Sequence, residues 1–328
     1  WQISLLDNSL SDNPDFATLA ASWSGQYGWR WMFGVEAVPA MLFFVLMFFV
    51  PESPRWLMVH RNDYAKAREI LEVSDPEGVD EAIKAIHESI DEEKKQATLA
   101  TFFTKRFTKP IILAFLIAFF NQMSGINAII YFAPRVFEMA GIGKSAAFLQ
   151  SAGIGLANLV FTMLGLYLID RIGRKKLMII GSVGYIISLG AVAAAFYFQW
   201  LGGIVVPVLL FMFIASHAIG QGAVIWVFIS EIFPNQVRSY GQSLGRSTHW
   251  VMAAIVTSVF PFFANNPAIG PAKIFFFFML MMVWQLLWVL FRMPETKGVP
   301  LEQLEAQLLL KSSQKKAAVI KKAAAIVE

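Results

Sequence analysis

The sequence contains no cysteine, which excludes disulfides, thiolate metal ligands and thiol nucleophiles. Charged residues are scarce as well: they make up 15% of the 328 residues, whereas hydrophobic residues make up 57%. The four histidines have no metal-ligand spacing, and no Ser-His-Asp arrangement or phosphate-binding loop is present. We therefore expect no enzyme activity, no catalytic residue, no metal, no cofactor and no nucleic-acid partner. So apolar a composition is typical of a membrane protein.

Seven apolar stretches are long enough for a helix to cross the hydrocarbon layer, which needs about 20 residues. Strands of a membrane barrel would be shorter and would alternate in polarity, so the sequence predicts an all-α membrane protein embedded in a lipid bilayer. In the fifth stretch, Pro207, Gly220 and Gly222 favour a discontinuous helix. The stretches lie at residues 31–50, 110–137, 146–169, 177–200, 204–230, 244–265 and 272–293.

Lysine and arginine are concentrated in alternate loops. Segment 51–109 carries ten of them, the loop after the third stretch carries four, and the loops in between are nearly bare. By the positive-inside rule the rich loops are cytoplasmic. The sequence therefore predicts a multi-pass protein of the cell (inner) membrane whose linker 51–109 and C-terminal tail 294–328 are cytoplasmic.

The linker is expected to be helical. Asn62 or Asp63 is suited to cap a first helix, and Asp75-Pro76-Glu77 is a start signal for a second one. The second helix is predicted to be amphipathic, with an apolar face formed by Ile83, Ile86 and Ile90. Such a linker is either a solvated connection or a latch against the cytoplasmic ends of the spans.

Three amides, Asn121, Gln122 and Asn127, interrupt the second apolar stretch. Amides in hydrocarbon are costly unless they are hydrogen-bonded. Because they carry no net charge, they suit a neutral, hydroxyl-rich ligand, in practice a sugar. On an ideal helix 122 and 127 are about 140° apart, so Ser124-Gly125 is expected to bend the helix and make the amides converge. The alternative is that the same amides hydrogen-bond between helices.

Charged motifs follow four of the stretches at their predicted cytoplasmic ends. Each motif places opposite charges at a helix terminus, where a lone surface ion pair contributes little. Together they predict a network that holds the cytoplasmic side closed and breaks as the helices part. The motifs read PESPRWL at 51–57, DRIGRKK at 170–176, EIFP at 231–234 followed by Arg238, and PETKG at 294–298.

With the NQxSGIN…Y string from Asn121 to Tyr131, these motifs occur in the order found in the sugar porter family of the major facilitator superfamily, which the chain resembles over roughly residues 29–310. The resemblance implies sugar transport between two six-helix halves that alternately open to each side of the membrane. It also implies that this chain holds the C-terminal six-helix bundle, one preceding span and a cytoplasmic helical linker.

On this resemblance the first five spans of the family have no counterpart, so the chain supplies about half of the sugar cavity. Its expected partner is the missing N-terminal half of the same transporter, and we expect no transport by the chain alone. The expected organisation is an external or irregular segment at 1–30, family span six at 31–50, the linker at 51–109, the bundle at 110–293 and the tail at 294–328.

The resemblance also implies which residues contact the sugar. Asn121 and Gln122 stand where the family has a Gln-Gln pair, although Asn121 is one methylene shorter. Trp226 matches a Trp that forms an apolar floor under the sugar ring, and His249 stands where relatives place an amide next to Trp. The whole expected set is Asn121, Gln122, Asn127, Asn158, Trp226 and His249.

The gating residues are inferred in the same way. Tyr131 matches a Tyr of the external gate in the family. The charged residues of the four motifs are the expected cytoplasmic gate: Glu52, Arg55, Asp170, Arg171, Arg174, Glu231, Arg238 and Glu295.

Glu36 is the acidic residue inside an apolar stretch, about 22 Å from Pro51 along a helix. A charge at such depth needs a partner, a proton or an interface. Proton-coupled members of the family have a Glu here, so Glu36 is a candidate proton relay and protons are an expected second substrate. The expected function is therefore proton symport of a monosaccharide, a hexose or a pentose. An uncoupled sugar uniporter and a membrane sugar sensor on the same fold are the alternatives.

Overall fold

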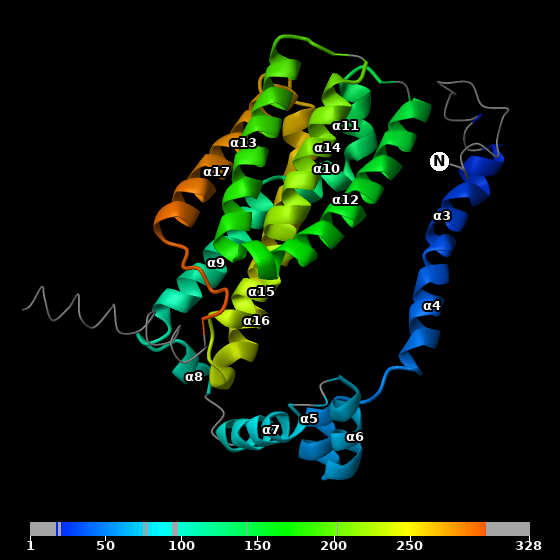
Figure 1. Cartoon of the computed structure of the whole chain (residues 1–328). Helices are drawn as coiled ribbons and strands as arrows, with labels where there is room; N and C mark the ends of the chain where they lie inside the picture. The colour runs from blue at the N-terminus through cyan, green and yellow to red at the C-terminus, as the bar shows by residue number, and fades with distance from the viewer. Residues whose placement is uncertain are drawn as a thin grey trace, which may run out of the picture. The chain divides into compact units, whose positions relative to one another are not determined.

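The computed structural model describes residues 18, 21–74, 76, 78–93, 98–142, 144–201 and 203–299, and the regular elements in these ranges are all helical. The chain divides into two compact units, Trp1–Gln96 and Ala97–Glu328 (Figure 1). Most of segment 1–30 and of the expected tail 294–328 lies outside the described residues.

Seven helical runs are long and apolar enough to cross a membrane, which agrees with the predicted number. The sixth begins at Arg238 and not at residue 244, because its helix continues through the polar residues that precede the apolar stretch. The runs are Gly25–Met47, Thr108–Tyr131, Ala152–Ile172, Arg174–Tyr197, Val205–Glu231, Arg238–Ala264 and Gly270–Phe291.

The first run starts before residue 31, so the last residues of segment 1–30, which we expected to be external or irregular, are helical. The helix continues through Arg30, since arginine is a good helix former, and its guanidinium donates to the carbonyl of Gln26 one turn earlier (2.9 Å). The elements here are the π-helix η1 (Ser24–Gly28), α3 (Trp29–Val35) and α4 (Ala37–Met47).

The predicted linker is helical and begins with α5 (Pro54–Trp56), η2 (Leu57–Arg61), α6 (Tyr64–Ser74) and α7 (Val79–Glu93). Asp63 caps α6, since its carboxylate accepts a hydrogen bond from the Lys66 amide (3.0 Å). Asn62 instead takes the left-handed conformation that ends η2. The expected apolar face of α7 is present where it is described: Ile83 and Ile86 pack on a small core of Leu57, Met58 and Ala67.

The second unit is a helical bundle. In it α13 packs along both α14 and α17, and α9 packs along α16 (Figure 1). Its elements are α8 (Leu99–Phe102), α9 (Thr108–Met123), α10 (Ile126–Tyr131), α11 (Ala133–Met139), α12 (Lys144–Ile172), α13 (Arg174–Tyr197), α14 (Val205–His217), η3 (Ala218–Gly222), α15 (Ala223–Glu231), η4 (Asn235–Val237), α16 (Arg238–Ala264) and α17 (Gly270–Phe291).

Buried polar side chains separate two apolar cores within this bundle. α9, α13 and α17 each contribute buried apolar residues to both cores, and so does the helical run from α14 to α15. In each of these helices, at least one buried polar residue lies between the residues that belong to one core and those that belong to the other. We call this set the polar layer; it consists of Asn121, Gln122, Ser182, His217, Gln221 and Gln285.

Two of the spans are interrupted at this layer. The predicted bend at Ser124-Gly125 is confirmed, because α9 ends at Met123 and α10 begins at Ile126. The Ser124 hydroxyl donates to the carbonyl of Asn121 (2.6 Å) and accepts from the amide of Ile126 (3.3 Å), so it satisfies backbone groups that the break releases. Gly125 has φ of +80° and lies against the ring of Phe278, which leaves no room for a Cβ atom.

The second interruption is the π-helix η3, as the glycines of the fifth stretch predict. Gly220 of η3 packs directly on the backbone of Gly181 in α13, where a Cβ atom on Gly220 would lie 2.9 Å from the Gly181 Cα. Pro207 lies in the first turn of α14 and therefore does not cause the interruption.

Gly125→Ala tests whether the bend needs both the left-handed backbone and the space that Phe278 leaves. We expect it to destabilise the fold by about 2–4 kcal/mol, since a side chain in this conformation costs about 1 kcal/mol and overpacking adds about 1–3. The matched control is Gly203→Ala, which also has positive φ but open space around it, and should lose only about 1 kcal/mol. Equal drops in the circular-dichroism melting temperature of the two variants in detergent would show that the space beside Phe278 is not required.

Candidate functional site

The side chain of Gln122 is the centre of the candidate site. It is fully buried, and its amide nitrogen donates to Oδ1 of Asn121 (3.0 Å). The same nitrogen lies 3.2 Å from both ring nitrogens of His249 in α16. With both amide hydrogens engaged, the carbonyl oxygen Oε1 is left buried without a hydrogen-bond partner. A buried acceptor left unpaired is destabilising, so this oxygen is suited to accept a hydrogen bond from a ligand hydroxyl.

Trp226 of α15 completes the cluster. Its ring lies 5.3 Å from the imidazole of His249, between ring centres, and 39% of the residue is exposed. The guanidinium of Arg246, one turn before His249 on α16, lies 5.9 Å from the centre of the Trp226 ring. The cluster therefore joins an accessible aromatic surface to buried amides, an arrangement typical of sites that take an organic ligand with polar edges.

The other predicted sugar contacts are not joined to this cluster by any hydrogen bond or ring contact among the described residues. Asn127 lies half-buried on α10, beyond the helix break, and Asn158 lies half-buried on α12. Tyr131 ends α10 and is 58% exposed, so its ring is accessible. The structure thus brings together Asn121, Gln122, Trp226 and His249.

Glu36, the candidate proton relay, lies between α3 and α4 in the first unit. It is exposed there, and its backbone amide closes the end of α3 by bonding to the carbonyl of Phe33 (3.2 Å). Among the described residues, no group of three or more His, Cys, Asp or Glu side chains is arranged to hold a metal ion.

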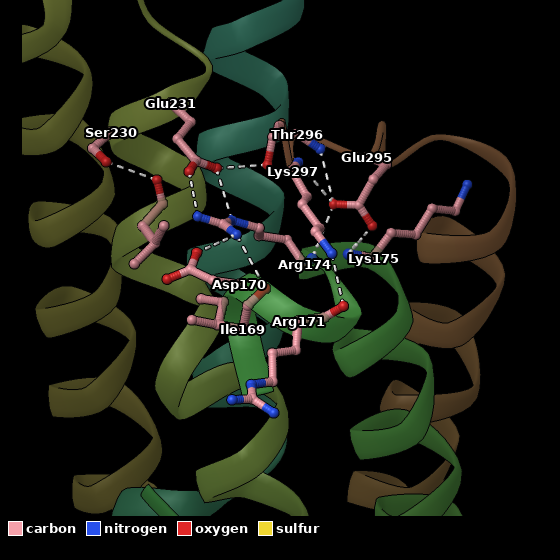
Figure 2. A network of polar contacts seen from close by, with 11 residues as sticks. Ile169, Asp170, Arg171, Arg174, Lys175, Ser230, Glu231, Glu295, Thr296 and Lys297 are labelled. Carbon is pink, nitrogen blue, oxygen red and sulfur yellow. Dashed lines mark hydrogen bonds and ion pairs between the residues drawn. The ribbon is translucent and has the colours of Figure 1, made fainter. Parts of the chain in front are cut away.

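Arg174, at the start of α13, organises a polar network at the end of the bundle (Figure 2). Its guanidinium is bidentate to Glu231 of α15, with Nη2 to Oε1 at 2.7 Å and Nε to Oε2 at 3.2 Å. Nη1 also donates to the Asp170 carboxylate (2.8 Å) and to the carbonyl of Ile169 (3.0 Å) in α12. Only 9% of the Arg174 side chain and 24% of the Glu231 side chain are exposed, so this bidentate pair is largely shielded from water, whereas the Asp170 side chain is 78% exposed.

Glu295 joins the segment after α17 to the same network (Figure 2). Its carboxylate accepts from the backbone amides of Arg174 (2.9 Å) and Lys175 (3.1 Å), and so caps the N-terminus of α13. Gly173 precedes them with φ of +97°, and a Cβ atom there would lie 2.6 Å from the Glu295 carboxylate. The neighbouring Thr296 hydroxyl donates to Glu231 (2.6 Å), so three motifs of the sequence meet here.

The remaining predicted gating residues are placed differently. The side chain of Arg171 stacks over Tyr167 (4.1 Å to the ring centre), and only its carbonyl joins the network, by accepting from Nζ of Lys297 (2.7 Å). Arg238 donates to the carbonyl of Phe233 (3.4 Å). Glu52 and Arg55 belong to the first unit, where Glu52 lies 3.5 Å from the guanidinium of Arg61.

Two hydrogen-bonded groups that involve residues of the polar layer were missed from the sequence. The Tyr185 hydroxyl of α13 lies 2.5 Å from Nδ1 of His217. In the second group, Gln221 donates to Gln285 (2.5 Å), and Gln285 donates to Ser182 (2.8 Å). The available signal was a polar residue near the middle of each of these spans, the same signal that identified Gln122.

Comparison with known proteins gives one family. The family model described as "Sugar (and other) transporter" matches residues 15–308. The chain is 33% identical over 296 residues to the arabinose-proton symporter of Bacillus subtilis (strain 168), covering 88% of this chain and 63% of that protein. It is 35% identical over 291 residues to the D-xylose-proton symporter of Escherichia coli (strain K12), covering 87% and 58%. The chain thus spans less than two thirds of the length of these relatives.

A solved structure agrees with the sequence match. The proton:xylose symporter XylE of E. coli, bound to 6-bromo-6-deoxy-D-glucose, is similar with a TM-score of 0.73 at 33% identity, covering 94% of this chain and 64% of that chain. The similarity includes the helical bundle that holds both the amide cluster and the Arg174 network. The chain therefore belongs to the sugar porter family of the major facilitator superfamily, a family of transporters and not of enzymes, and is a multi-pass integral membrane protein.

Proposed function

We propose that this chain takes part in carrying a monosaccharide, a hexose or a pentose, across the cell membrane by alternating access. The observation that carries the proposal is the unpaired, buried Oε1 of Gln122, which lies in a cluster with His249 and the accessible indole of Trp226. A sugar offers this cluster two matching surfaces: hydroxyl groups for the amides and the C–H face of the ring for the indole.

In this proposal the broken helix α9–α10 orients the amides toward the ligand. Asn121 fixes the amide of Gln122, His249 holds its second hydrogen, and Oε1 accepts a bond from a sugar hydroxyl. Asn127 is half-buried on α10, beyond the break, and Asn158 is half-buried on α12; in this proposal both contact the sugar as well. Tyr131, exposed at the end of α10, covers the site from the outside.

Proton coupling is part of the proposal. The relatives named above are proton symporters of arabinose and xylose, and Glu36 provides an acidic group within the first span. In this role Glu36 takes up a proton from one side and releases it to the other as the transporter changes state. A Glu36→Gln variant lacks this carboxylate, so its side chain cannot take up and release the proton.

The Arg174 network serves as the cytoplasmic gate. It ties α12 and α13 to α15 and to the segment after α17. Because the Arg174–Glu231 pair is bidentate and largely shielded, separating α15 from α13 breaks both of its charge-assisted bonds together, and this pair therefore stabilises the closed state. The proposal also places the linker 51–109, with its ten basic residues, and the tail 294–328 on the cytoplasmic side.

The test is counterflow of labelled D-xylose, L-arabinose, D-glucose and D-galactose in proteoliposomes. The chain is reconstituted alone and together with the N-terminal spans of the E. coli D-xylose symporter, because it spans less than two thirds of that relative. We expect counterflow of at least one sugar in the combined preparation, and accumulation of that sugar when an inward proton gradient is imposed. If none of these sugars is bound or exchanged in either preparation, the proposal is wrong.

Gln122→Ala tests the role of the unpaired oxygen. We expect about tenfold weaker sugar affinity in equilibrium dialysis, the equivalent of one hydrogen bond of about 1.4 kcal/mol. Gln221→Ala is the matched control: Gln221 is equally buried and also has an unpaired Oε1, but it bonds to Gln285, away from the cluster. Gln221→Ala should lower thermal stability and leave sugar affinity unchanged. If Gln221→Ala weakens sugar affinity and Gln122→Ala does not, the sugar binds elsewhere in the polar layer.

Arg174→Gln tests the gate. Because the chain contains no cysteine, Ser230→Cys next to Glu231 supplies a single labelling site. We expect a membrane-impermeant maleimide to label Cys at this site about 10- to 150-fold faster when Arg174 is replaced, since loss of a charge-assisted bond removes about 1.5–3 kcal/mol. Arg171→Gln is the control, because the described contacts of that side chain do not include Glu231 or Asp170. Equal labelling rates in the two variants would show that the network does not govern closure.

A further inference from the structure

Arg246 is a charged residue inside a membrane span. It lies on α16, eight residues after Arg238, so the helix carries it about 12 Å into the run Arg238–Ala264. Charged side chains inside spans are rare because they are costly in hydrocarbon, and those that occur commonly mark the path of a substrate or an ion. The sugar contacts and the gate proposed above do not use this charge.

The packing of α15 on α16 brings Arg246 to the candidate sugar site. Gly245 lies against Ile229 of α15, where a Cβ atom would be 2.6 Å from Cδ1, so the two helices approach closely beside Arg246. The guanidinium lies 5.9 Å from the centre of the Trp226 ring. Arg246 and His249 are three residues apart and therefore lie on one face of α16, and the ring of Trp226 contacts both.

The guanidinium is accessible to a ligand that lies on the indole. The Arg246 side chain is exposed, and so is part of Trp226. A guanidinium that contacts an aromatic ring retains its N–H donors, and their planar fork matches a carboxylate bidentately. A ligand on the indole is therefore within reach of two different kinds of group, the neutral amide of Gln122 beside His249 and the cation of Arg246.

We propose that the preferred substrate of this site is a hexuronate, a hexose whose C6 is a carboxylate, and that Arg246 is the specificity-determining residue that binds this carboxylate. This inference rests on the proposed function and names its substrate class. The pyranose ring lies on Trp226, a ring hydroxyl donates to Oε1 of Gln122, and the guanidinium donates to the carboxylate oxygens. One carboxylate balances the single charge of Arg246, whereas the dianion of a sugar phosphate would bring excess charge into the span.

Equilibrium dialysis tests the proposal with D-glucuronate and D-glucuronamide, which have the same shape and differ in charge at C6. The full chain is used, alone and combined with the N-terminal spans as for counterflow. At about pH 7, where the carboxyl is ionised, we expect D-glucuronate to bind about tenfold or more tightly than the amide, the contribution of a hydrogen bond to a charged group. This comparison needs no variant, and equal affinities would overturn the proposal.

Substitution of Arg246 tests whether this residue is the source of the preference. In Arg246→Gln the ratio of the two affinities should fall to about one. Arg246→Lys should keep part of the ratio, because lysine retains the charge but lacks the planar fork. Circular dichroism confirms that each variant is folded. A ratio that persists in Arg246→Gln would contradict the assignment.

Two further ligands and one matched variant distinguish a hexuronate site from other anion sites. D-Gluconate has a carboxylate but no ring, so it should bind more weakly than D-glucuronate, and D-glucose 6-phosphate should also bind more weakly. Arg135→Gln removes an exposed arginine that bonds to Asn265 at the far end of α16 (3.4 Å), and it should keep the ratio. Equal binding of D-gluconate would identify an anion site that does not use the indole. Tighter binding of D-glucose 6-phosphate would identify a phosphate site, and loss of the ratio in Arg135→Gln would identify general electrostatic attraction; each outcome contradicts the proposal.

Failure of this inference differs from failure of the proposed function. If D-glucose binds and Gln122→Ala weakens its binding, while D-glucuronate has no advantage over its amide, the site takes neutral sugars and only the inference about Arg246 is wrong. If the neutral sugars and D-glucuronate all fail to bind in both preparations, the proposed function is wrong as well.

Discussion

A buried amide inside an apolar bundle must find a hydrogen-bond partner, and this requirement organises the middle of the structure. Gln122 bonds to Asn121 and His249, and Gln221 bonds to Gln285. Both glutamines retain one oxygen without a partner, but only Gln122 belongs to a cluster with an accessible aromatic ring. The same polar layer coincides with the interruptions of two spans of the bundle, so these helix breaks and the polar groups are parts of one arrangement.

The network at the end of the bundle also contains a buried polar group that needs partners, but this group is a charged guanidinium and not an amide. Arg174 is largely buried and needs counterions, which Glu231 and Asp170 supply from two other helices. Glu295 adds a cap for α13 and uses backbone amides that the helix leaves unpaired. The bidentate Arg174–Glu231 pair is either formed or broken as α13 and α15 separate, and this property suits an element that must be either closed or open.

The sequence was sufficient for those features that depend on local chemistry. The number of spans follows from the length of the apolar stretches, and the break at Ser124-Gly125 follows from the glycine. The cap at Asp63 follows from its short carboxylate side chain. It did not identify His249 as the partner of Gln122, or the Tyr185–His217 pair. Those contacts depend on how each helix is rotated about its axis, and helices that are apolar on all sides carry no stripe that reveals the rotation. The capping role of Glu295 was missed for another reason, since it needs a contact between segments 120 residues apart.

The proposed transport mechanism depends most on the oxygen of Gln122 receiving a hydroxyl from the sugar. Solid-state NMR measures this most directly, as the distance between the labelled side-chain carbonyl of Gln122 and a ¹³C-labelled sugar that counterflow shows to be carried. We predict that a sugar oxygen lies at hydrogen-bonding distance, about 2.7–3.2 Å, from Oε1. A bound sugar whose atoms all lie beyond contact with Gln122 would contradict the mechanism.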